Sequence, residues 1–124
     1  MSEADSRTLV EKPWGWENRF AVTDRYLGKV IHINPGEMLS LQYHQHKDET
    51  IYVVRGVMDL QLENDRGAIL THRLTPGMSM RIEPGRKHRM AAVEECEFFE
   101  VSSPEIDDVV RLEDKYGRAG TTHA

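Results

Sequence analysis

Four side chains that can bind a metal ion lie close together in the stretch LQYHQHKDET. Gln42, His44 and His46 occupy every second position, and Glu49 follows three residues later. In a strand, alternate side chains point to the same face, so the first three would share one face. Amide and imidazole groups are costly to bury without partners, so this pattern fits a cavity in which a metal ion or another ligand supplies the partner. The alternative is a solvated strand end that carries two surface histidines.

The positions of the neighbouring glycines favour the metal site. Five residues separate Gly36 from Gln42, four separate His44 from Glu49, and six separate Glu49 from Gly56. This arrangement resembles the first sequence motif of the cupin superfamily, with glutamine in the position of the first histidine.

A later stretch resembles the second cupin motif. Gly77 is followed after six residues by Pro84-Gly85, and two further residues precede His88. The spacing is one residue longer than usual, and Ala92 stands where the motif usually has asparagine. Both motifs occur in the usual order with their turn glycines, which indicates that His88 joins the histidine-bearing strand at one site.

Two sets of four ligands are compatible with these motifs. The first set is Gln42, His44, Glu49 and His88, and the second replaces Gln42 with His46. We favour the first, because only two residues separate His46 from Glu49, which leaves the chain little room to bring the carboxylate back. These nitrogen and oxygen donors suit one divalent transition metal ion, either Zn, Mn, Fe, Ni or Co. His46 would then lie one step further along the same face, at the mouth of the pocket, as a candidate catalytic acid–base group.

Short apolar segments between turn signals must position these residues. The turn signals are rich in Pro, Gly, Asn and Asp and fall at 34–36, 56, 64–67, 75–77 and 83–85. The segments between them show no long helical period, which is typical of an all-β sandwich or barrel. The predicted strands span residues 17–23, 27–33, 37–44, 50–55, 57–63, 68–74, 78–82, 88–93 and 97–102.

The two ends of the chain lack this strand pattern. We expect a flexible N-terminal segment over residues 1–10, a single domain over residues 11–118 and a C-terminal tail over residues 119–124. The charged stretch 104–120 predicts a short helix or an ordered arm.

The composition excludes several classes of protein. The chain has 124 residues and a net charge of −5, without a basic run, so we expect no nucleic-acid partner. Cys96 is the one cysteine, which excludes an intrachain disulfide and a cysteine-type zinc site. No apolar stretch reaches membrane-spanning length, so we expect no membrane partner and a cytoplasmic location.

Lys29 and Glu100 are charged residues within apolar strands. Lys29 has the strand parity of Ile31, which favours an inward position where it could contact a sugar oxygen or carry a proton. The alternative is a lysine whose head reaches the solvent at the rim. Glu100 has the parity of Phe98 and could face inward as a general base, although we slightly favour an ordinary outward charge.

Arg81 and Trp14 are candidates for contact with a substrate. Arg81 lies just before a Pro-Gly turn and could point into the cavity or away from it. Trp14 could form a wall on which a sugar ring stacks. The alternative, which we favour, is that Trp14 anchors the N-terminal arm across the barrel.

Four stretches together resemble the type II mannose-6-phosphate isomerase domain, a cupin usually fused behind a mannose-1-phosphate guanylyltransferase. They are KPWGW, INPGEMLSLQYHQHKDETIYVVRG, IEPGRKHRM and IDDVVRLEDKYGR, and the resemblance extends over residues 11–118. It implies a single cupin domain, which is a double-stranded β-helix or jelly-roll barrel. We expect a stand-alone domain without the guanylyltransferase and its activity.

The resemblance also implies a function, which is metal-dependent isomerisation of a sugar or sugar phosphate between aldose and ketose forms. The metal ion would bind adjacent sugar oxygens, and His46, Lys29 or Glu100 would move the proton between carbon 1 and carbon 2. Arg111 or Arg118 would hold a phosphate through bidentate hydrogen bonds. Without the resemblance, these two arginines fit a solvated charged tail.

Two other functions fit the same residues. An Fe(II)-dependent cupin oxygenase and a non-catalytic sugar-binding or sensor cupin would both use these metal ligands. We also expect a homodimer in which sheet edges pair and the N-terminal arm with Trp14 and Trp16 crosses to the partner.

Overall fold

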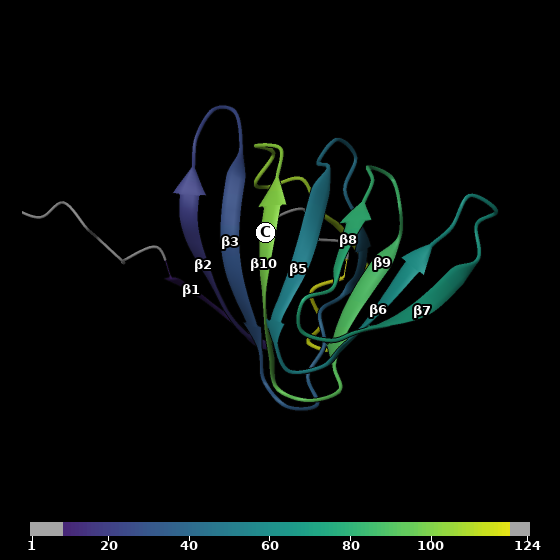
Figure 1. Cartoon of the computed structure of the whole chain (residues 1–124). Helices are drawn as coiled ribbons and strands as arrows, with labels where there is room; N and C mark the ends of the chain where they lie inside the picture. The colour runs from purple at the N-terminus through teal and green to yellow at the C-terminus, as the bar shows by residue number, and fades with distance from the viewer. Residues whose placement is uncertain (1–8, 120–124) are drawn as a thin grey trace, which may run out of the picture.

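The structure, a computed structural model, describes residues 9–119, which contain eleven β-strands (Figure 1). The strands are β1 (Leu9–Lys12), β2 (Gly15–Val22), β3 (Leu27–Ile33), β4 (Leu41–Tyr43), β5 (Glu49–Arg55), β6 (Met58–Glu63), β7 (Ile69–Leu74), β8 (Ser79–Ile82), β9 (His88–Ala92), β10 (Cys96–Ser102) and β11 (Val110–Glu113). One sheet has the order β1-β2-β3-β10-β5-β8, and the other has the order β11-β4-β9-β6-β7. No helix in this part of the chain is long and apolar enough to cross a membrane.

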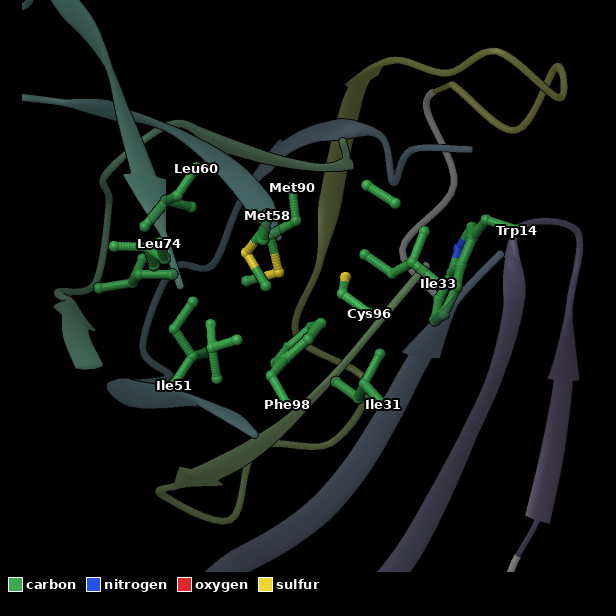
Figure 2. Close-up of a cluster of buried hydrophobic side chains, with 13 residues drawn as sticks. Trp14, Ile31, Ile33, Ile51, Met58, Leu60, Leu74, Met90, Cys96 and Phe98 are labelled. Atoms are coloured by element: carbon green, nitrogen blue, oxygen red, sulfur yellow. The ribbon is translucent and has the colours of Figure 1, made fainter. Parts of the chain in front are cut away.

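The two sheets enclose one apolar core. Ile31, Ile51 and Phe98 from the six-stranded sheet pack with Met58 and Leu60 from the five-stranded sheet (Figure 2). Burial of such side chains stabilises the fold by about 1.5–3 kcal/mol each relative to exposure. Each sheet is antiparallel and pairs strands that are distant in the sequence, such as β10 between β3 and β5, which confirms the predicted all-β jelly-roll barrel.

The inward side chains change from apolar to charged along the strands of the six-stranded sheet. In β3 the buried Lys29 lies two residues before the core residue Ile31. In β10 Phe98 lies in the core and Glu100 is buried two residues later, opposite Lys29 in the strand register. β5 likewise begins with the buried Glu49. The fold therefore places a polar cavity directly beside the apolar core.

The ends of the chain differ from the sequence prediction. Residues 9 and 10 belong to β1, which pairs with β2, while residues 1–8 and 120–124 lie outside the described residues. The stretch 104–120 contains β11, which pairs with β4, so the helix prediction is wrong and the arm is ordered as a strand. β4 is shorter than predicted, because within the stretch 37–44 only residues 41–43 form a continuous strand, and Met38 makes an isolated bridge to Ala91.

Gly56 makes the tight connection between β5 and β6. Its φ of 83° lies in the left-handed region that favours glycine. A Cβ atom at this position would come within 2.0 Å of the Glu95 carbonyl oxygen. The turn therefore requires glycine for both its conformation and its space.

Candidate metal centre

Three predicted ligands come together inside the barrel. His44 follows β4, Glu49 begins β5 and His88 begins β9, and all three side chains are buried. Their ligand atoms all lie within 4.8 Å of one another. Oε1 of Glu49 lies 2.9 Å from Nε2 of His44 and 3.7 Å from Nε2 of His88.

The outer nitrogen of each imidazole is held by a backbone carbonyl. Nδ1 of His44 contacts the Asp108 carbonyl oxygen, and Nδ1 of His88 lies 2.9 Å from the Arg86 carbonyl oxygen. A carbonyl only accepts hydrogen bonds, so Nδ1 is the donor in each ring, which leaves Nε2 as the nitrogen that can offer a lone pair to a metal ion. Burial lowers the pKa of His88 to about 4, which keeps this ring neutral near pH 7.

The two imidazole lone pairs therefore converge with the carboxylate of Glu49. Oε1 of Glu49 and Nε2 of His88 are buried without a hydrogen-bond partner among the described residues. Burial favours the neutral carboxyl, but the nearby Lys47 ammonium acts in the opposite direction, and the pKa of Glu49 lies well below its usual range. Two lone pairs and one negative charge facing the same point fit a divalent transition metal ion.

Gln42 lies beside this cluster. It is opposite His88 in the pairing of β4 and β9 and lines the same cavity. Its Oε1 accepts a hydrogen bond of 2.6 Å from the Ser40 hydroxyl. Its role as a fourth ligand stays a prediction.

The structure places His46 away from the cavity. The alternation of inward and outward side chains in β4 ends with the strand at Tyr43. In the loop that follows, the backbone N–H groups of Gln45, His46 and Lys47 donate hydrogen bonds to the carboxylate of Asp108. The His46 side chain is exposed and does not line the cavity, so its expected place on the inward face is wrong. Lys47 points inward in its place and is 4% exposed.

Eight charged side chains line the cavity, and five of them are cationic. They are Lys12, Glu17, Lys29, Lys47, Glu49, Glu100, Arg111 and Arg118. Among the described parts of this acidic chain, the cavity is thus a local concentration of positive charge. An anionic ligand is the kind that such a lining attracts.

Two buried ion pairs stand next to the metal ligands. Nζ of Lys47 lies 2.8 Å from Oε2 of Glu100, and Nζ of Lys29 lies 3.2 Å from Oε2 of Glu17. Burial and the nearby Glu49 raise the pKa of Glu100. Burial alone would lower the pKa of Lys47, but Glu100 and Glu49 together raise it, so the ammonium stays charged. The inward position expected for Lys29 is observed, whereas Glu100 is also buried and takes the inward alternative rather than the favoured outward one.

The arginines divide between the cavity and the surface. Arg111 is 7% exposed and lines the cavity, where burial and then Arg118 lower its pKa. Arg118 also lines the cavity and forms a bidentate pair with Asp114 at 2.9 and 3.1 Å. Arg81 is exposed and forms a bidentate pair with Asp48 away from the cavity, because its position in β8 points outward. The inward alternative for Arg81 is therefore wrong.

Trp14 belongs to both the apolar core and the cavity wall. It is 3% exposed, packs in the apolar cluster and lines the cavity wall (Figure 2). Trp16 instead stacks on His32, with the two ring planes 8° apart. Trp14 thus fits the anchoring role, and a sugar contact stays a prediction.

Comparison with known proteins accounts for this combination of barrel and ligands. A family model described as "Cupin domain" matches residues 29–102, which include all three clustered ligands. The chain belongs to the cupin family.

Relatives of this cupin carry names that refer to alginate biosynthesis and to mannose 1-phosphate. The alginate biosynthesis protein AlgA of Pseudomonas aeruginosa is 34% identical over 122 residues, which cover 94% of the chain and 24% of the relative. The mannose-1-phosphate guanylyltransferase of Escherichia coli is 35% identical over 114 residues, which cover 88% of the chain and 23% of the relative. The cupin thus spans about a quarter of the length of these relatives.

A solved structure supports the fold of the cupin. KdgF from Halomonas sp. superposes with a TM-score of 0.70 at 22% identity, over 83% of this chain and 90% of that one. At this identity the likeness concerns the fold alone.

Three cavity residues were not singled out from the sequence. Glu17 is opposite the core residue Ile31 in the register of β2 and β3, so strand parity with a known inward position would have found it. Lys12 lines the cavity from β1, which the sequence did not predict. Lys47 lies in a loop held by distant contacts, where no periodic pattern exists to reveal it.

Proposed function

We propose that this cupin is a metal-dependent isomerase that converts a sugar phosphate between its aldose and ketose forms. The observation that carries the proposal is the position of the buried Lys47–Glu100 pair beside the His44, Glu49 and His88 ligands. The sequence resemblance to type II mannose-6-phosphate isomerases makes mannose 6-phosphate and fructose 6-phosphate the first substrates to test. The kinship with a protein named for mannose 1-phosphate supports a phosphorylated sugar.

The reaction requires a proton to move between carbon 1 and carbon 2 while negative charge develops on an oxygen. A divalent ion held by His44, Glu49 and His88 would supply stabilisation for that charge. Glu100 is suited to take and return the proton, because its raised pKa makes it a stronger base than an ordinary carboxylate. The charged Lys47 holds Glu100 in place and stabilises its ionised form.

The cationic side of the cavity would hold the phosphate. Arg111 and Arg118 come from the C-terminal arm, and Lys12 comes from β1, so all three reach the cavity from outside the strands that bear the ligands. Guanidinium groups can bind phosphate oxygens through two parallel hydrogen bonds. A protein with a net charge of −5 needs such a local positive region to recruit an anion.

The direct test follows deuterium in the product. Metal-loaded protein is incubated with mannose 6-phosphate in deuterated water, and fructose 6-phosphate is analysed by NMR. A base that exchanges its proton with solvent should introduce deuterium at carbon 1. The Glu100→Gln variant, loaded with the same metal, should bind the sugar phosphate but give no exchange. A wild-type protein that binds hexose and pentose phosphates tightly without exchange would be a sensor, and the isomerase proposal would be wrong.

A second candidate rests on the ligand set itself. Two histidines and one carboxylate form the ligand set of non-haem Fe(II) oxygenases. The eight charged side chains of the cavity disfavour an apolar oxidation substrate. Oxygen uptake by the Fe(II)-loaded protein in the presence of a sugar phosphate would favour this alternative.

A further inference from the structure

Asp108 contacts the four consecutive residues that follow β4. Its backbone carbonyl oxygen accepts a hydrogen bond from Nδ1 of His44. Its carboxylate accepts hydrogen bonds from the backbone N–H groups of Gln45, His46 and Lys47, at 3.0, 2.7 and 2.9 Å. One residue near the end of the chain therefore holds both a metal ligand and the loop behind that ligand.

The short strand β4 depends on the C-terminal arm, by which we mean residues 104–119. β11 of this arm pairs with all three residues of β4, whereas β9 on the other side pairs with Gln42 alone. Beyond the strand, the Gly85 N–H donates to the His44 carbonyl oxygen at 2.6 Å. The backbone of His44 is thus held on one side by the turn before His88, and its imidazole is held on the other side by the arm.

The arm also forms part of the cavity wall. Val109 is 4% exposed and lines the cavity, as does Arg111 two residues later. Alternate residues of an extended chain point to the same side, so these two side chains face inward together while Asp108 reaches the loop after β4. The contacts of Asp108 therefore determine which residues of the arm face the ligands.

The hydrogen bond between Asp108 and His44 links the arm to metal binding. The Asp108 carbonyl keeps the proton of the neutral ring on Nδ1, which leaves Nε2 able to bind a metal ion. When Nε2 binds a cation, the ring becomes more positive, and its Nδ1–H becomes a stronger donor to the same carbonyl. Such linkage is reciprocal, so docking of the arm strengthens metal binding by the factor by which metal binding strengthens docking.

We propose that Asp108 is a positioning residue of the metal centre, which docks the C-terminal arm on the loop after β4 and holds His44 in the tautomer that binds a metal ion. Metal binding and docking of the arm then stabilise each other. This inference rests on the metal site of the proposed function and not on the isomerisation of a sugar phosphate.

The first test measures zinc affinity by competition with a chelator. Asp108→Ala removes the acceptor of three backbone N–H groups, and we expect zinc to bind at least about 10-fold more weakly. Asp107→Ala is the matched control, because it removes the same charge from the exposed neighbouring position, and it should keep the wild-type affinity. Asp108→Asn keeps one acceptor oxygen and should lie between the two. It remains informative if circular dichroism shows that Asp108→Ala is unfolded.

The second test observes the imidazole rings, which a general loss of stability would affect alike. Long-range proton–nitrogen NMR spectra of zinc-free wild type should show the proton on Nδ1 in both His44 and His88. In Asp108→Ala and Asp108→Asn, only His44 should become a mixture of tautomers. His88 is the internal control, because its Nδ1 donates to the Arg86 carbonyl instead. Two rings that respond alike would overturn the positioning role.

The third test measures the reciprocal effect by hydrogen–deuterium exchange. Zinc should slow amide exchange in β11 by at least about 5-fold in the wild type, and by less in Asp108→Asn. β7 is the matched control, because β11 and β7 are the two edge strands of the same sheet and β7 lies far from the ligands in the strand order. Its exchange should change less than that of β11.

Two results would overturn the coupling. One is a zinc affinity that is the same in the wild type and in folded Asp108→Ala and Asp108→Asn. The other is zinc binding that slows exchange in β11 no more than in β7. Neither result depends on catalysis, so each would leave the isomerase proposal standing. A protein that gives all the expected responses but exchanges no deuterium with sugar phosphates would support the role of Asp108 and overturn the isomerase proposal alone.

Discussion

Nζ of Lys47 lies 2.8 Å from Oε2 of Glu100, and each of these side chains is only 4% exposed. Lys47 reaches this position from a loop, whereas Glu100 is an inward residue of β10. Isolated charges are very costly inside a protein, so the pair is stable only as a unit. Its position beside the Glu49 carboxylate gives the cavity a base and a cation within reach of the metal ligands.

We predict that Glu100→Gln lowers kcat by about 100-fold to 10,000-fold, the usual contribution of a general base. The substitution keeps the size of the side chain, and bound metal should stay at the wild-type level. His46→Gln is the control, since this histidine is exposed, and it should change kcat less than about threefold. The opposite result, with His46 essential and Glu100 dispensable, would make His46 the acid–base group and contradict the role proposed for Glu100. Steady-state kinetics on metal-loaded proteins decide between them.

Lys12 gives the cavity a pH-dependent cation. Burial lowers its pKa to about 8, although Glu17 acts in the opposite direction. The ammonium is charged below that pH and neutral above it, so KM for a sugar phosphate should rise as the pH increases through about 8. Lys12→Arg keeps the charge and should move this rise to higher pH. An unchanged KM profile in the arginine variant would separate Lys12 from phosphate binding.

Gln42→Ala tests the fourth ligand. If the amide oxygen contributes to the metal site, this variant should bind the ion at least about 10-fold more weakly, measured by competition with a chelator. Ser40→Ala removes only the hydroxyl that donates to Gln42, and it should have a smaller effect. Equal affinity in Gln42→Ala and wild type would restrict the ligands to the three clustered residues.

Gly56→Ala should destabilise the protein more than Gly77→Ala. Both glycines have a positive φ, which costs a residue with a Cβ about 1–2 kcal/mol. Only Gly56 also lacks space, because its Cβ would lie 2.0 Å from a backbone oxygen, whereas the space around Gly77 is open to 4 Å. Urea unfolding should therefore show a larger loss for Gly56→Ala. Equal losses of unfolding free energy would mean that the backbone around Gly56 shifts at little cost to make room for the added methyl group.

The sequence predicted the barrel and the meeting of His44, Glu49 and His88, because both depend on local spacing. Turn glycines and apolar segments mark the strands, and the spacing between His44 and Glu49 matches the loop that returns the carboxylate to the cavity. Strand parity also placed Lys29 correctly, and for Glu100 it offered the inward position that the structure shows, although the outward one was favoured.

Distant contacts decided what the sequence could not predict. Asp108 fastens the loop after β4, some sixty residues away in the chain, and thereby turns His46 outward and Lys47 inward. β11 was missed for a similar reason, because this short edge strand depends on pairing with β4 rather than on a pattern of its own. The alternation of side chains between two faces holds within a strand, and it cannot predict side-chain direction beyond the strand end.

Metal analysis tests the central claim most directly. Protein purified without a histidine tag should contain one divalent transition ion per chain by elemental analysis, and His88→Ala should lose most of it. His72→Ala, which changes a histidine on β7 outside the cavity, should retain the full amount. Equal metal content in wild type and a folded His88→Ala variant, or none in a wild type exposed to Zn, Mn, Fe, Ni and Co, would contradict the metal site formed by His44, Glu49 and His88.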